Sequence, residues 1–182
     1  MPEPSALSTA QSYRITAVCL GNICRSPIAE IILVDRFERA GLAQLVQVDS
    51  AGTGDWHVGG RADRRTIAVL RRHGYDIDHS PRQITADWFA GINLLLAMDS
   101  TNFRDLQRMA PSSSVKSVHM SRSHLRMLRS FDPVLSALPA PHPELDLPDP
   151  YYGTPEDFEL VLALVERAAD GVVDFVRQDL AL

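Results

Sequence analysis

Four short apolar segments along the chain have the patterns of β-strands. Residues 46–50 alternate between apolar and polar positions, as a strand with one buried face does. Residues 93–98 form an almost continuous apolar run, which is typical of a strand buried on both faces. Residues 13–18 and the shorter segment 125–128 are also predicted to be strands. The pattern therefore predicts four strands.

Amphipathic segments with helical spacing lie between and after these strands. The predicted helices cover residues 27–39, 64–73, 102–109 and 156–180. Proline is favourable in a first helical turn, so Pro27 can open the first helix, and Gly41 can end it. Strands that alternate with helices predict an α/β fold with a parallel sheet flanked by helices on both faces.

The remaining segments define the predicted domain organisation. Residues 1–12 are expected to form a flexible N-terminal tail and residues 13–182 a single domain without internal repeats. Residues 111–123 carry six serines and residues 133–148 carry five prolines, so both are predicted to be loops. Residues 88–89, Trp-Phe, are assigned to the core.

Composition and charge exclude several classes of protein. The 182 residues are 45% hydrophobic, and their net charge of −5 argues against a general nucleic-acid binder. No apolar run approaches the roughly 20 residues that a membrane helix needs. No secretory signal is visible at the start, so a cytoplasmic protein is expected, with signal-independent export left open.

The two cysteines lie together after the first predicted strand, in the sequence Val-Cys-Leu-Gly-Asn-Ile-Cys-Arg-Ser-Pro of residues 18–27. Five residues separate Cys19 from Arg25. A loop of this length before a helix can curl so that its backbone N–H groups face one anion-sized hollow. Their positive field would favour the thiolate of Cys19, and the planar fork of Arg25 could grip two phosphate oxygens. A spacing of this kind also arises by chance around a buried structural cysteine, but the flanking strand and helix favour a phosphate site.

Other residues of this loop fit the same chemistry. Ser26 can donate a hydrogen bond to the sulfur, and Gly21 and Asn22 tolerate left-handed backbone. The predicted phosphate-binding loop is therefore formed by Leu20, Gly21, Asn22, Ile23, Cys24, Arg25 and Ser26.

With this loop, the chain resembles the low-molecular-weight protein tyrosine phosphatases, and it resembles the bacterial members most closely. The resemblance extends from about Arg14 to Val176. It includes the segments 19–29, 49–53 (Asp-Ser-Ala-Gly-Thr), 82–85 (Arg-Gln-Ile-Thr), 98–99 (Met-Asp) and 149–153 (Asp-Pro-Tyr-Tyr-Gly). It implies a four-stranded parallel sheet and a phosphatase that hydrolyses phosphotyrosine through a phosphocysteine.

The resemblance also implies roles for residues outside the loop. Asp149 takes the position of the family's general acid, whereas spacing alone leaves Asp132 and Asp146 open. The expected walls of the substrate slot are Trp56 and Tyr151, with Tyr152 at its rim. A supporting network of Asn22, Ser26, Ser50 and His79 is expected to hold the phosphate loop. Cys24 is expected to be a resolving cysteine that captures oxidised Cys19 as a disulfide, with simple packing as the alternative.

Competing functions remain at this stage. An arsenate reductase on the same fold needs further cysteines, and none follows Cys24. Relatives that act on phosphoarginine carry threonine at the position of Ile23, so isoleucine favours phosphotyrosine. A phosphotyrosine-binding module without turnover is disfavoured because Cys19, Arg25 and Asp149 are all present.

The expected partners are phosphotyrosine-containing proteins, with inorganic phosphate or vanadate as inhibitors and neither nucleic acid nor membrane as a ligand. The six histidines lack metal-ligand spacing, so no metal or other cofactor is expected.

Overall fold

The structure, a computed structural model, describes residues 12–111 and 125–182. The tail expected over residues 1–12 therefore lies outside the described residues except for Ser12, and the serine-rich loop does so except for Pro111. The boundary of a single domain at residue 13 stays a prediction.

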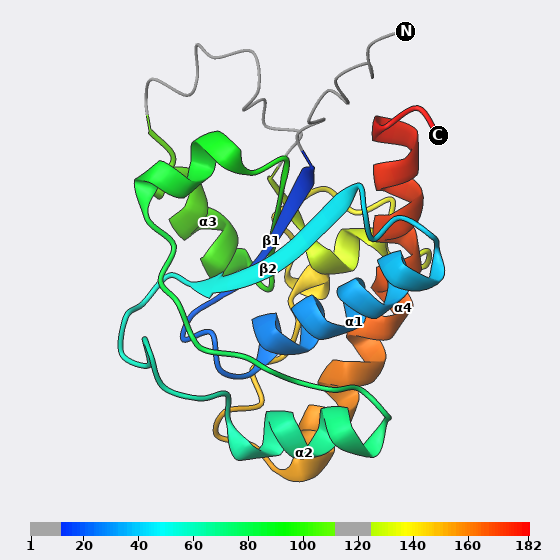
Figure 1. Ribbon diagram of the computed structural model, residues 1–182. Helices are drawn as coiled ribbons and strands as arrows, with labels where there is room; N and C mark the ends of the chain where they lie inside the picture. Colours follow the sequence, from blue (N-terminus) through cyan, green and yellow to red (C-terminus); the bar gives the residue numbers. More distant parts are fainter. Residues whose placement is uncertain (1–11, 112–124) are drawn as a thin grey trace, which may run out of the picture.

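A four-stranded sheet forms the centre of the molecule (Figure 1), and its strand order is β2-β1-β3-β4. The strands are β1 (Tyr13–Cys19), β2 (Val46–Gly52), β3 (Leu94–Ala97) and β4 (Leu125–Met127). All three pairings are parallel. The predicted fold class is thus confirmed, and every predicted strand is present.

Four α-helices follow the strands in the chain: α1 (Arg25–Arg39), α2 (Arg64–Arg72), α3 (Ser100–Met109) and α4 (Pro155–Asp179). Short 3-10 helices lie at η1 (Ala86–Gly91), η4 (Leu128–Phe131) and η5 (Pro143–Leu145). The predicted start of α1 at Pro27 was two residues late. Proline is tolerated throughout a first turn, where N–H groups have no intrahelical partner, so it does not mark the first residue.

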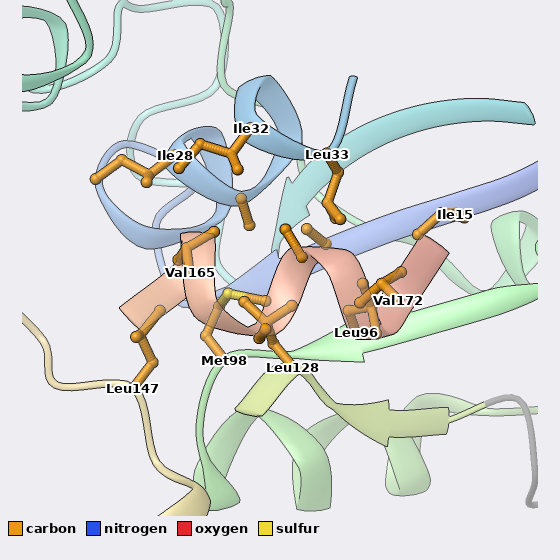
Figure 2. Close-up of a cluster of buried hydrophobic side chains, with 14 of the residues drawn as sticks. Ile15, Ile28, Ile32, Leu33, Leu96, Met98, Leu128, Leu147, Val165 and Val172 are labelled. Carbon is orange, nitrogen blue, oxygen red and sulfur yellow. The ribbon is translucent and has the colours of Figure 1, made fainter. Parts of the chain in front are cut away.

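The two faces of the sheet pack against different helices. Ile15 of β1 and Leu96 of β3 lie in one cluster with Ile32 of α1 and Val172 of α4 (Figure 2). The alternate residues of the strands, such as Val18, pack on the opposite face in a second cluster that includes residues of η1 and α3. This division follows the period of two along a strand.

Residues 88 and 89 were both predicted to lie in the core, and they differ in burial. Phe89 is buried, but Trp88 is only half-buried. Trp88 packs against the second cluster, and the guanidinium carbons of Arg14 and Arg82 lie 5.0 Å and 5.3 Å from the centroid of its ring, close enough for cation–π contacts.

The strand order also places a crevice where a site can form. The chain leaves β1 for β2 on one side, whereas β3 lies on the other side of β1. In open parallel sheets, ligands bind at the carboxyl ends of the strands at such a reversal. The loop from Cys19 to Arg25 and the residues after Ala97 meet at this point.

Candidate active site

The loop between β1 and α1 closes around one hollow. A pocket of about 300 Å³ is lined by Cys19, Leu20, Gly21, Ile23, Cys24, Arg25, Trp56, His57, Asp149, Tyr151 and Tyr152. Cys19 is 3% exposed and has no disulfide partner. The structure therefore brings the two ends of the loop together with two segments that are distant in sequence, residues 56–57 and 149–152.

The carbonyl groups of this loop point away from the hollow that the loop encloses. The carbonyl oxygens of Cys19, Leu20, Asn22 and Ile23 accept hydrogen bonds from the amides of Thr53 and Gly54, the ring of His79 and the amide of Asp63, at 2.9 to 3.0 Å. In a trans peptide the N–H group points away from the carbonyl. The N–H groups of Leu20, Gly21, Ile23 and Cys24 thus point away from these outer partners, as an anion-binding nest requires.

Asn22 holds the loop in this curled form. Its φ of 56° lies in the left-handed region that asparagine tolerates better than most residues. Its side-chain amide donates to Ser26 Oγ and Ser50 Oγ, both at 2.8 Å, and its Oδ1 accepts from the backbone N–H of Arg82 at 2.9 Å. Its own N–H donates to the sulfur of Cys19 at 3.3 Å. Asn22 therefore connects Cys19, the candidate nucleophile, to Ser50 of β2.

Behind Asn22, a carboxylate completes the network. Ser50 Oγ donates to Glu30 Oε2 at 2.5 Å, and the same oxygen lies 3.3 Å from His79 Nδ1. His79 Nε2 faces the carbonyl of Asn22 and therefore donates to it. The four supporting residues expected from the resemblance lie in one network, and Glu30 is a member that the sequence did not indicate.

Ser26 lies beside the sulfur of Cys19, with 3.0 Å between Oγ and Sγ. Because Ser26 Oγ accepts from Asn22, its own hydrogen remains for the sulfur or for the carbonyl of Ala51 at 3.4 Å. A hydroxyl in this place can stabilise a thiolate, whether it attacks or departs.

Arg25 lies between two carboxylates at the side of the pocket. Its Nη1 donates to Asp99 Oδ2 at 2.5 Å and to the carbonyl of Leu147 at 3.2 Å, and its Nη2 donates to Asp149 Oδ2 at 2.8 Å. Burial lowers the pKa of this guanidinium, but the charges of Cys19, Asp149 and Asp99 outweigh burial and raise it. Arg25 is thus a fixed cation beside the sulfur.

The aromatic residues expected as walls lie at the mouth of the pocket. Trp56 is 71% exposed, Tyr151 40% and Tyr152 97%. The two tyrosine rings meet edge to face with 4.8 Å between their centroids. The structure also places His57 in the lining, a position that no motif in the sequence predicted.

Cys24 lies in the same lining but in a different environment. It is 4% exposed, and burial, followed by the charges of Asp63, Cys19 and Asp149, raises its pKa to about 12 against a weaker lowering by a hydrogen bond with Thr66. Its thiol is therefore protonated near neutral pH, which excludes it as the resting nucleophile.

Within residues 12–111 and 125–182, no group of three or more His, Cys, Asp or Glu side chains could hold a metal ion. In the same ranges, no helix has both the length and the apolar character to cross a membrane.

A curled loop with a cysteine at its start and an arginine at its end, on a parallel α/β sheet, defines a site of the cysteine phosphatase class. The family model for low molecular weight phosphotyrosine protein phosphatases matches residues 14–182, and the chain belongs to this family. The low molecular weight protein-tyrosine-phosphatase of Streptomyces coelicolor is 46% identical over 167 residues, which are 92% of this chain and 95% of the relative.

Solved structures agree in fold. A protein tyrosine phosphatase from Entamoeba histolytica, determined with Hepes in its active site, is 28% identical with a TM-score of 0.79, over 92% of this chain and 99% of that chain. A Drosophila arginine phosphatase is 25% identical with a TM-score of 0.76, over 91% and 98% of the two chains. Enzymes with different substrates thus share this fold. The fold does not identify the substrate of this chain, so the substrate has to be inferred from the residues that line the pocket.

Proposed function

We propose that this chain hydrolyses phosphotyrosine in proteins through a phosphocysteine at Cys19. The observation that carries the proposal is the common pocket of Cys19, Arg25 and Asp149, with Cys19, which is 3% exposed, at its floor and aromatic rings at its mouth. A tyrosyl phosphate is long enough to reach such a sulfur, and its ring can lie between Trp56 and Tyr151.

In the first step the thiolate of Cys19 attacks phosphorus, and the bond from phosphorus to the tyrosyl oxygen breaks. Asp149, which leaves Arg25 and takes up a proton from solvent as the phosphate binds, gives that proton to the tyrosyl oxygen, so neutral tyrosine leaves. The loop N–H groups and Arg25 stabilise the charge on the equatorial oxygens.

In the second step water attacks the phosphocysteine and loses a proton to Asp149. The bond between phosphorus and sulfur breaks, and inorganic phosphate leaves. Ser26 donates to the departing thiolate of Cys19, as the 3.0 Å contact between Oγ and Sγ allows. The roles proposed for these side chains need no metal ion.

The position of Ile23 favours phosphotyrosine over phosphoarginine as the substrate. Its side chain lies in the lining and is 7% exposed, so it offers an apolar surface to the group beside the phosphate. A guanidinium leaving group would lose water there without gaining a hydrogen bond.

The test is a panel of substrates with the purified chain in the presence of EDTA. Phosphotyrosine peptides should be hydrolysed far faster than phosphoserine and phosphothreonine peptides, whose short side chains cannot carry the phosphate to the pocket floor. Inorganic phosphate and vanadate should inhibit competitively. Equal rates on phosphoserine would refute the deep slot, and faster turnover of phosphoarginine would reverse the choice of substrate.

Two free, buried cysteines fit a reducing compartment, so we propose cytoplasmic phosphotyrosine proteins as substrates.

A further inference from the structure

The segment that carries Asp149 is firmly attached at its ends and sparsely attached in its middle. At one end the N–H of Leu147 donates to the carbonyl of Met98 at 2.8 Å, and at the other the N–H of Thr154 donates to Asp157 at 2.6 Å. Between them, residues 150–153 form a turn closed by a bond from Gly153 N–H to Pro150 O at 2.9 Å. Pro150 is buried, but Tyr151 is 40% exposed and Tyr152 97%, so hydrophobic burial contributes little to the position of the second half of the turn.

Arg65, in the first turn of α2, reaches across to this turn. Its Nη2 donates to the carbonyl of Tyr151 at 2.9 Å and its Nη1 to the carbonyl of Gly153 at 3.1 Å. The guanidinium also lies over the ring of Phe158 in the first turn of α4, with 4.6 Å to the ring centroid. A planar fork thus holds the backbone on both sides of Tyr152.

The other edge of the same guanidinium is fixed by Asp63. Arg65 Nε and Nη2 donate to its two carboxylate oxygens at 3.0 and 2.8 Å. Hydrogen bonds from Arg65 come first among the causes that lower the pKa of this carboxyl, so the pair is ionised at neutral pH.

Asp63 and its helix in turn contact the phosphate-binding loop. The carbonyl of Ile23 accepts from the N–H of Asp63 at 2.9 Å and from Thr66 Oγ1 at 3.0 Å. Continuous hydrogen bonds therefore run from the loop that holds phosphate, through Asp63 and Arg65, to the turn that carries Asp149.

We propose that Arg65 is a positioning residue that holds Asp149 at the leaving-group oxygen once substrate is bound. In the free protein Asp149 is also held by Arg25, but a bound phosphate takes that guanidinium for its own oxygens. Arg65 contacts only backbone carbonyls of the turn, so phosphate does not compete for it. The inference rests on the proposed function, in which Asp149 is the general acid.

The experiment compares Arg65→Ala, Arg65→Lys and Asp149→Ala with the parent chain. The measurement is kcat/KM for a series of aryl phosphates whose leaving groups range from para-nitrophenol to phenol. A positioned acid matters most for the poorest leaving group, so losing it steepens the dependence of kcat/KM on leaving-group pKa. Arg65→Ala should steepen it partly, with a loss of about 10-fold for phenyl phosphate and a smaller loss for para-nitrophenyl phosphate. Arg65→Lys, which keeps the charge without the fork, should lie between parent and alanine variant.

A double variant and a control separate this role from general destabilisation. Adding Arg65→Ala to Asp149→Ala should not steepen the dependence further, because Arg65 acts through Asp149. Inhibition by inorganic phosphate should stay within about two-fold of the parent in Arg65→Ala, since the phosphate loop keeps its own contacts. The matched control is Arg72→Ala, which removes an α2 arginine paired with Glu159 of α4 outside the pocket and should leave the dependence unchanged.

The outcomes are distinguishable. A steeper dependence in Asp149→Ala with none in Arg65→Ala would overturn the role of Arg65 and leave the proposed function intact. An unchanged dependence in Asp149→Ala itself would overturn both the acid and its positioning residue.

Discussion

Two loops meet in the pocket, and they are built in opposite ways. In the loop after β1, Cys19, Asn22, Arg25 and Ser26 are at most 3% exposed, and outer partners fix its carbonyls. In the turn before α4, the Asp149 side chain is 47% exposed and Tyr152 97%. Burial and many hydrogen bonds fix the conformation of the first loop, whereas only a few hydrogen bonds fix the conformation of the turn.

The difference corresponds to what each loop has to do. An anion site is most effective when its donors are fixed before the ligand arrives, because no reorganisation is then needed. A proton donor at the mouth has to let a whole protein side chain pass. We therefore expect changes that remove the supporting hydrogen bonds of the first loop to affect folding and chemistry together, and changes in the turn to affect chemistry alone.

The largest effect is expected at Cys19. Cys19→Ser should abolish turnover of para-nitrophenyl phosphate, because a hydroxyl at neutral pH does not replace the thiolate. Binding of phosphate or vanadate, measured by calorimetry, should be largely retained, since the loop N–H groups and Arg25 remain. Activity that persists in this variant, with Cys24 present, would refute the assignment of the nucleophile.

Asp149→Ala should lower kcat by about 10²–10⁴-fold, the usual range for a positioned proton donor, without a change in thermal midpoint. The other two carboxylates supply the controls. Asp146 accepts from the N–H and Oγ of Ser100 at 2.7 and 2.6 Å at the start of α3, and Asp132 is buried beside Arg167. Asp146→Ala and Asp132→Ala should therefore reduce stability more than turnover. The acid is misassigned if either lowers kcat more than Asp149→Ala does.

Asn22→Gly tests how firmly the first loop is fixed. Glycine accommodates the φ of 56°, so this variant removes the side-chain hydrogen bonds without adding backbone strain. Loss of these buried bonds should reduce the free energy of unfolding by about 1–3 kcal/mol, measured by urea denaturation, and kcat/KM should fall as well. Tyr152→Ala, the comparison in the turn, should change unfolding by less than about 0.5 kcal/mol. Equal stability of the two variants would remove the contrast between the loops.

Cys24 provides the smallest expected effect and a pH dependence. Cys24→Ser should hydrolyse substrate nearly as well as the parent, but after peroxide treatment it should recover less activity with dithiothreitol. Because burial above all raises the pKa of Cys24 to about 12, its thiolate increases about tenfold per pH unit through the neutral range. Protection by Cys24 should therefore be weaker at pH 6.5 than at pH 8.5. Identical recovery of both proteins at both pH values would leave Cys24 with a packing role.

The strands and the phosphate loop could be predicted from sequence because their signals are local. Residues 93–98 are almost all apolar, and the residues from Cys19 to Arg25 lie between a strand and a helix. The helix start was misplaced because Pro27 is compatible with any position in a first turn. Asp99 could have been predicted too, since it lies two residues after the end of β3, where sites in such sheets form.

Other parts of the site depend on contacts that no local pattern encodes. Arg65 meets the carbonyl of Gly153 across 88 positions of sequence, through a backbone atom that every residue has. Glu30 lies on α1 between apolar residues, and only the packing of α1 beside β2 brings it to Ser50. Trp88 packs against the second apolar cluster but is only half-buried, and the side chains of Arg14 and Arg82 also lie over its ring.

The ion pair between Arg25 and Asp149 has a consequence for product release. In the free protein this carboxylate occupies one edge of the guanidinium that a phosphate would grip, so it acts as an intramolecular competitor for the product. A competitor tethered beside the site has a high effective concentration. Once Asp149 has released the proton that it took from water, its carboxylate replaces the departing phosphate at Nη2 of Arg25, while Nη1 stays paired with Asp99. This replacement lowers the cost of emptying the pocket for the next turnover.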